Sequence, residues 1–102
     1  MPIVLTHADR FASSARPDDQ YWLTGWRFQY PEMRQSGFLK LESSANAVIR
    51  SVAREQGVPL VDAAAVLSGD PRNFADHAHF TDLGSSRMAR LLTGAVLRAL
   101  KR

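Results

Sequence analysis

Two short, mostly apolar runs stand at the two ends of an amphipathic segment. The runs are PIVLTH at residues 2–7 and VPLVD at residues 58–62. Runs of this length that are rich in β-branched residues predict buried strands. Because a helical pattern lies between them, the sequence predicts a parallel βαβ unit with a right-handed crossover.

The helix between the strands is expected from about Leu39 to Gln56. Gly57 stands where a glycine commonly ends a helix, and Pro59 prevents the helix from resuming. Apolar residues fall on one stripe of this helix, which is the face expected to pack on the sheet. The stripe consists of Leu41, Ala45, Val48, Ile49, Val52 and Ala53.

A second amphipathic helix is expected near the end of the sequence, with Thr81 as its N-cap. Before it, AAAVLSGD at residues 63–70 predicts a short helix or a turn closed by Gly69. The alternation of strands and helices is typical of an α/β fold. The buried face expected for the last helix consists of Leu83, Met88, Leu91, Leu92, Val96 and Leu100.

The segment between the first strand and the first helix has two parts. Residues 8–20 are small and polar and predict a loop, whereas residues 21–30, YWLTGWRFQY, hold five aromatic residues in ten positions. One interpretation is a loop folded back on the core by its aromatic side chains. The other is the wall or lid of a ligand pocket, for which His7, Trp22 and Trp26 are the candidate residues.

Composition narrows the function classes. The 102 residues suit one domain, and an apolar content of 45% allows a packed core. The net charge of +3 comes from basic residues spread along the chain. Their one cluster, Arg98, Lys101 and Arg102, suits the end of a helix dipole, so no nucleic-acid partner is expected. The absence of cysteine excludes disulfides and a thiol nucleophile.

Targeting signals are not apparent in the sequence. The N-terminus has no basic region followed by a long apolar run, and no segment approaches the roughly 18 apolar residues of a membrane helix. As written, the chain is therefore expected to be cytoplasmic and to have no membrane span.

The polar residues before the last helix carry the candidate chemistry. Asp76, His77, His79 and Asp82 lie within seven residues. The spacing of three lets the Asp76 carboxylate reach Nδ1–H of His79, which leaves the other ring nitrogen free to accept a proton. Such a pair is expected at the rim formed by the carboxyl ends of the strands. A plain solvent-exposed polar loop fits the same spacing.

A metal site is a further interpretation of this cluster. In an extended segment, His77 and His79 would lie on the same side, and Asp76 or Asp82 could add an oxygen ligand. His7, the remaining histidine, would have to complete the site.

The segment from Gly57 to Leu100 resembles the C-terminal end of the SGNH, or GDSL-type, ester hydrolases. The matching features are a strand that ends at Asp62, then the block Asp76-His77-Ala78-His79-Phe80-Thr81, and Gly84 at the start of the last helix. The resemblance implies that His79 is the catalytic base and Asp76 the acid that orients it. We expect these two side chains to be hydrogen-bonded, Phe80 to point into the core, and His77 to be the more exposed histidine.

The other blocks of this family do not occur in the sequence. Its Gly-Asp-Ser nucleophile block, its oxyanion-hole glycine and its Gly-x-Asn-Asp asparagine have no counterpart here. The resemblance therefore implies the C-terminal half of a flavodoxin-like three-layer domain, starting at its fourth strand. The chain alone is expected to be an inactive ester hydrolase fragment without a cofactor. The alternatives are a non-enzymatic α/β interaction module and, less favoured, the metal-binding protein.

A half-domain would leave part of its sheet uncovered. The first strand, Ile3–Thr6, can be covered on one side by Val58–Asp62, and its other side would present unpaired backbone groups. We therefore expect marginal stability and self-association through the first strand.

Overall fold

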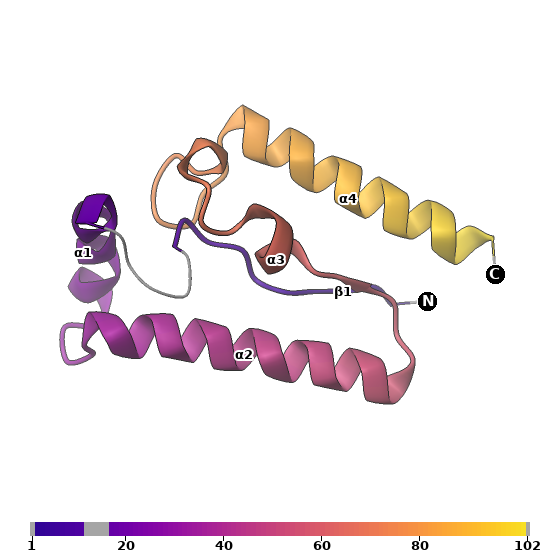
Figure 1. Cartoon of the computed structure of the whole chain (residues 1–102), viewed down its shortest axis with the longest axis horizontal. Helices are drawn as coiled ribbons and strands as arrows, with labels where there is room; N and C mark the ends of the chain where they lie inside the picture. Colours follow the sequence, from indigo (N-terminus) through magenta and orange to yellow (C-terminus); the bar gives the residue numbers. More distant parts are fainter. Residues whose placement is uncertain (1, 12–16, 102) are drawn as a thin grey trace.

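The computed structural model describes residues 2–11 and 17–101 (Figure 1). Helices outweigh strands in this mixed α/β structure. The elements in chain order are β1 (Val4–Leu5), the 3-10 helix η1 (Pro17–Asp19), α1 (Gln20–Gln29), α2 (Gln35–Gln56), β2 (Leu60–Val61), α3 (Ala63–Leu67), the 3-10 helix η2 (Pro71–Asn73) and α4 (Asp82–Leu100).

The two strands pair in parallel, which confirms the expected βαβ unit. Val4 lies opposite Leu60, and Leu5 lies opposite Val61. Helix α2 makes the crossover and lies on one side of β1, whereas α3 and α4 lie on the other side (Figure 1). Both strands run toward the end of the molecule that holds α1 and the loop before α4 (Figure 1). This end is therefore the carboxyl-end rim of the sheet.

Both strands are shorter than expected because side chains replace the backbone ladder at their ends. The Thr6 hydroxyl donates to Asp62 Oδ1 at 2.8 Å and accepts from the backbone N–H of Ala64. Arg50 holds both oxygens of the Asp62 carboxylate, at 2.7 and 2.9 Å, and this hydrogen-bonded guanidinium lowers the pKa of Asp62. Asp62 thus joins the end of β2, the start of α3 and the middle of α2.

Helix α2 starts at Gln35, earlier than expected, and ends at Gly57, which takes the expected left-handed conformation with φ 62°. The predicted buried stripe is wrong at several positions. Leu41, Val48 and Val52 are 57%, 61% and 49% exposed. The face that is buried holds Ala53, as expected, together with Phe38 and Asn46, which lie outside the predicted stripe. The reason is that polar side chains of α2 bind the ends of the short strands, so this face is not the most apolar one.

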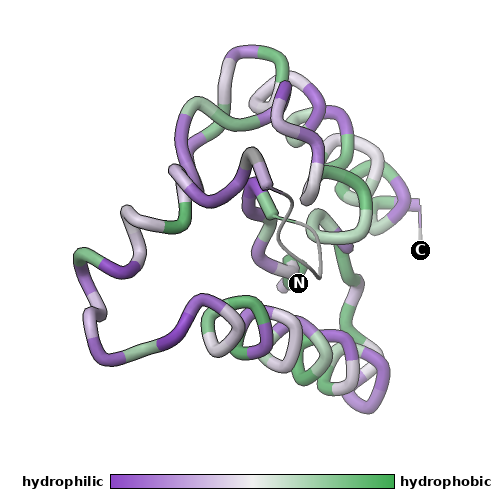
Figure 2. Tube along the Cα trace, turned by 60° about the vertical axis from the view of Figure 1, so that its left-hand side comes forward, coloured by the Kyte–Doolittle hydropathy of each residue, from purple (hydrophilic) through white to green (hydrophobic). Residues whose placement is uncertain are grey.

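Helix α4 begins as expected, because the Thr81 hydroxyl accepts a hydrogen bond from the backbone N–H of Gly84. Only part of its predicted apolar face is packed. Met88, Leu91 and Leu92 pack on the core, whereas Leu83, Val96 and Leu100 are largely exposed. Along the helices, apolar residues are interspersed with polar ones (Figure 2). The short helix expected in residues 63–70 is α3, and Gly69 follows it with φ 84°.

The aromatic segment is helical, so the loop expected for it is wrong. In α1, Leu23 and Trp26 are buried. The Trp26 ring lies 5.3 Å from that of Phe11 and 5.2 Å from that of Phe38, measured between centroids. These four residues form a second apolar cluster beside the main core. The alternation of aromatics was misleading because some of the rings point to solvent, namely Tyr21, Phe28 and Tyr30.

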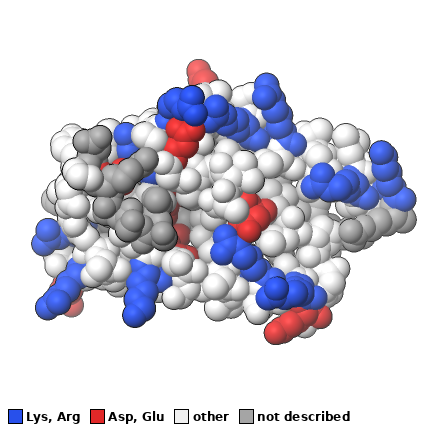
Figure 3. Space-filling view, viewed as in Figure 1, with Lys and Arg blue, Asp and Glu red and all other residues white. Residues whose placement is uncertain are grey.

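Two expectations fall partly outside the described residues. Of the loop predicted at residues 8–20, positions 12–16 are not described, and residues 17–19 form η1. Of the basic cluster at the end of α4, Arg102 is not described. On the face shown in Figure 3, lysine and arginine side chains lie at several separate places, in the middle of the face as well as at its edges. None of the described helices has the length and apolar character needed to cross a membrane.

Candidate functional site

The candidate chemistry lies in the loop of residues 74–80, which connects η2 to α4. Phe74 and Phe80 form an isolated antiparallel bridge, and their ring centroids are 5.4 Å apart. Inside this bridge, the backbone N–H of Ala75 donates to the His79 carbonyl at 2.7 Å. Phe80 packs against the main core, as expected. The Phe74–Phe80 bridge thus closes the loop, and residues 75–79 between the two phenylalanines lie at the carboxyl-end rim of the sheet.

Arg10 attaches this loop to the segment that follows β1. Its backbone N–H donates to the His77 carbonyl at 3.0 Å, and its guanidinium donates to the Phe74 carbonyl at 3.0 Å. The same guanidinium lies over the Trp22 ring, 4.4 Å from its centroid. Arg10 therefore connects the loop, the segment after β1 and α1.

Asp76 and His79 are hydrogen-bonded, as the spacing predicts. The distance from His79 Nδ1 to Asp76 Oδ2 is 2.8 Å. The other carboxylate oxygen, Oδ1, accepts backbone N–H groups of Ala78 at 2.9 Å and His79 at 2.7 Å. The carboxylate is therefore held at three points, while the His79 side chain is 79% exposed.

The charge of Asp76 determines the tautomer of His79. Partial desolvation raises the pKa of Asp76, but the hydrogen bonds from Ala78, from the His79 backbone and from the His79 ring outweigh it and lower the pKa to about 2. At neutral pH the carboxylate is ionised and can only accept hydrogen bonds. His79 Nδ1 must then carry the proton, which leaves the lone pair on Nε2. No hydrogen bond occupies Nε2 among the described residues.

His77 is not the more exposed histidine, and that expectation is wrong. Its ring packs edge-on against Trp26, with centroids 5.7 Å apart, and lies against Gly25 of α1. His79 is instead the exposed residue. The cause is the docking of α1 on this loop, which the sequence pattern did not reveal because the segment had no clear helical signal.

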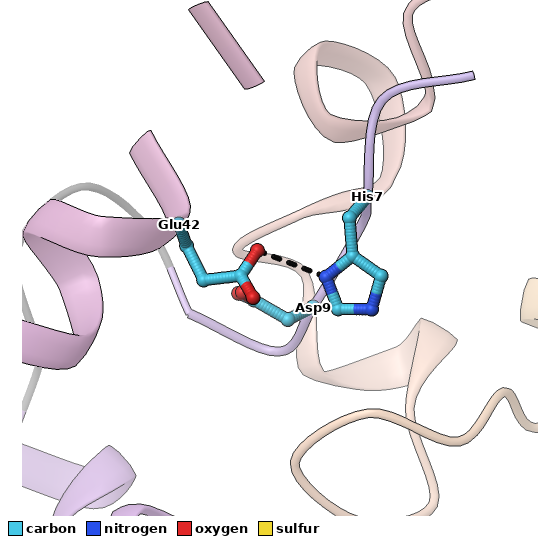
Figure 4. A group of neighbouring side chains, drawn as sticks. All are labelled: His7, Asp9 and Glu42. Atoms are coloured by element: carbon cyan, nitrogen blue, oxygen red, sulfur yellow. Dashed lines mark hydrogen bonds and ion pairs between the residues drawn. The ribbon is translucent and has the colours of Figure 1, made fainter. Parts of the chain in front are cut away.

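A second cluster of titratable groups lies where the chain leaves β1 (Figure 4). His7 Nδ1 lies 2.9 Å from Glu42 Oε2, and this hydrogen bond raises the pKa of His7. Asp9 is buried, and burial raises its pKa to about 6. Sequence reasoning missed Asp9 and Glu42, because His7 and Glu42 are 35 positions apart and no local motif relates them.

A hollow lies beside part of the aromatic segment. A hollow of about 420 Å³ is lined by His7 and Trp26, together with Tyr30, Met33, Glu42 and others. Trp22 does not line it, since its ring lies against Arg10 and Tyr21. Two of the three candidate pocket residues therefore share one hollow.

The metal site proposed on His77 and His79 does not gather its ligands. Within the described ranges, neither histidine belongs to a group of three His, Asp or Glu side chains whose ligand atoms lie within 4.8 Å of one another. The nitrogen of His79 nearest to Asp76 is used by the hydrogen bond to that carboxylate. Asp82 starts α4 and is exposed.

Comparison of the chain with protein-family models, with curated proteins and with solved structures finds no match. The case for a function therefore rests on the residues and their geometry.

Proposed function

We propose that Asp76 and His79 are the acid–base part of a Ser-His-Asp ester hydrolase of the SGNH type. The observation that carries the proposal is the 2.8 Å contact between His79 Nδ1 and Asp76 Oδ2, combined with an exposed imidazole. A carboxylate that fixes the Nδ1–H tautomer and leaves Nε2 toward solvent is the arrangement that a serine nucleophile requires.

In the proposed chemistry, Nε2 of His79 moves the protons and Asp76 stabilises the charge that forms on the ring. Nε2 of His79 takes the proton of a serine hydroxyl as the serine oxygen attacks the ester carbonyl. The Asp76 carboxylate stabilises the imidazolium that results. The imidazolium then returns its proton to the leaving alcohol, and a water molecule repeats the sequence to release the acid.

The proposal includes a larger fold. We propose that β1 and β2 belong to the sheet of a flavodoxin-like three-layer domain, and that another segment supplies the serine and the oxyanion-hole donors. The sequence contains no Gly-Asp-Ser block. Preorganised oxyanion donors are usually the largest single contribution to such catalysis, so the chain alone should not hydrolyse an activated short-chain ester above background.

Fluorophosphonate labelling tests the proposal. The chain alone should not be labelled. The upstream coding sequence should be read for an in-frame Gly-Asp-Ser block, and the longer protein should be labelled at that serine. In the longer protein, Asp76→Asn should reduce the rate of p-nitrophenyl acetate hydrolysis by roughly 10⁴-fold, because it favours the tautomer of His79 that cannot accept the serine proton.

Asp82→Asn is the matched control, since Asp82 is an exposed carboxylate six positions along the same segment. It should change the rate less than about twofold, a difference well under 1 kcal/mol in the barrier. Two results would contradict the proposal: a labelled serine in the chain alone, or a longer protein whose activity survives His79→Ala.

We also propose that the chain alone associates with a second copy through the free edge of β1. Among the described residues, β1 pairs only with β2, and Leu5 is 37% exposed. Unpaired strand edges favour pairing with another chain. Sedimentation velocity at rising protein concentration should show a dimer or larger species, and Leu5→Lys should shift the distribution toward monomer. A monomer at every concentration would refute this association.

A further inference from the structure

Three side chains from two distant parts of the sequence converge where the chain leaves β1. His7 and Asp9 follow the strand, and Glu42 faces them from α2 (Figure 4). One ligand atom from each, namely the imidazole nitrogen and two carboxylate oxygens, lies within 4.8 Å of the others. For bonds of about 2.0–2.2 Å to a central ion, ligand atoms are separated by roughly 3–3.5 Å. Small side-chain movements would therefore suffice to reach a shared ion.

Within the described part of the chain, the Asp9 carboxylate is hydrogen-bonded through one of its two oxygens. Asp9 is only 5% exposed, and its Oδ1 accepts the backbone N–H of Phe11 at 2.9 Å. Its Oδ2 has no hydrogen-bond donor among the described residues, and the carboxylate is turned toward that of Glu42 in Figure 4. The nearby guanidinium of Arg50 holds Asp62 with both of its bonds. Two carboxylates thus face each other, and the His7 ring is hydrogen-bonded to one of them, that of Glu42.

The residues of this cluster are held in place by other side chains. The buried Asn46, one turn after Glu42 on α2, accepts from the backbone N–H of His7 at 2.8 Å and donates to its carbonyl at 2.9 Å. The backbone N–H of Asp9 donates to the Ser68 hydroxyl at 3.0 Å. Supporting hydrogen bonds of this kind fix the positions of metal ligands before an ion binds.

Space for further ligands lies beside the cluster. A hollow of about 260 Å³ is lined by Asp9, Glu42, Asn46 and Ser68, among others. An ion held by three protein atoms would therefore keep an open position that water or a small anion could fill.

We propose that His7, Asp9 and Glu42 form a binding site for one divalent transition-metal ion, with Zn²⁺ as the best-fitting candidate. One imidazole and two carboxylates suit Zn²⁺, whereas Mg²⁺ prefers oxygen ligands only. The ion takes the place of the proton shared by His7 Nδ1 and Glu42 Oε2, and it compensates the charge of the buried Asp9. The site does not use Asp76 or His79, so it stands apart from the ester-hydrolase proposal.

Zinc titration of the chelator-treated full chain tests the site. Isothermal calorimetry with ZnCl₂ should give one ion per chain, and MgCl₂ at the same concentration should give no heat of binding. In histidine NMR spectra, the ring signals of His7 should change, and those of His77 should not. His7→Ala, Asp9→Asn and Glu42→Gln should each weaken the zinc Kd at least about tenfold, as even supporting residues do.

Asp76→Asn is the matched control, because it removes a carboxylate that is also bonded to a histidine. It should leave the zinc Kd within about twofold. If the buried Asp9→Asn fails to fold, Glu42→Gln decides, since the Glu42 side chain is 28% exposed and keeps its shape. The proposal is overturned if zinc does not bind, if Glu42→Gln binds as tightly as the wild type, or if Asp76→Asn abolishes binding.

Discussion

Replacing Gly84 by alanine should unfold the start of α4, although alanine is the better helix former. Gly84 is buried in the first turn of the helix. A Cβ built at this position would lie 2.1 Å from the Asn73 carbonyl oxygen and 2.9 Å from Phe80 Cδ1. Ordinary contacts need about 3.5 Å, so η2 and α4 would have to separate by roughly 1 Å or more.

The expected cost follows from the contacts that this separation disturbs. Overpacking costs about 1–3 kcal/mol. The hydrogen bond from the Thr81 N–H to the Asn73 carbonyl is 2.9 Å long and lies at a buried residue, so its loss costs about 1–3 kcal/mol more. Helix propensity returns about 1 kcal/mol. The free energy of unfolding should fall by about 3 kcal/mol, which lowers Tm by roughly 12–24 °C.

Gly94→Ala in the same helix is the matched control. There the new Cβ would meet only the far end of the flexible Arg98 side chain, at 3.2 Å. This variant should gain up to about 1 kcal/mol from helix propensity. Thermal and urea denaturation followed by far-UV circular dichroism measure both changes. The reasoning is refuted if Gly84→Ala is as stable as the wild type, or if both variants lose the same stability.

Two further changes test the surroundings of the site. Because the folded pKa of Asp9 is raised to about 6 from its ordinary 3.8, ionising it opposes folding. With chelator present, its contribution to stability should be complete below about pH 4 and lost as the pH rises through 6, and Asp9→Asn should remove this slope in urea denaturation. An unchanged slope would show that Asp9 titrates normally. His77→Ala should lower the free energy of unfolding by about 0.5–1.5 kcal/mol through the lost contact with Trp26, as measured by urea denaturation. The exposed His79→Ala should cost less, and equal losses would contradict the packing of His77.

Local patterns predicted those parts of the structure whose causes are local. The Thr81 cap, the Gly57 ending of α2 and the Asp76–His79 bond each depend on residues within four positions of one another. The parallel pairing of the two strands was also predictable, because two apolar runs joined by a helix leave few other arrangements.

The errors arose where distant segments meet. The buried face of α2 is centred on Asn46 and not on the apolar stripe, because that side chain binds the backbone of His7, 39 positions away. The exposure of the two histidines was reversed because α1 packs on His77. Neither contact could be predicted from the periodicity of apolar residues along the sequence.

The attachment of Arg10 to the loop of residues 74–80 has a consequence for the order of folding. The Asp76–His79 bond closes a turn of four residues and can form early. The bond from Arg10 to the Phe74 carbonyl spans 64 positions. Closing so long a loop costs chain entropy, so this bond should form only when β1 has docked on the rest of the fold. The turn therefore forms early, but its orientation relative to the sheet is fixed late in folding. Amide exchange at His79 and at the Arg10 N–H should therefore report two separate events, the first local and fast, the second as rare as the opening of the whole sheet.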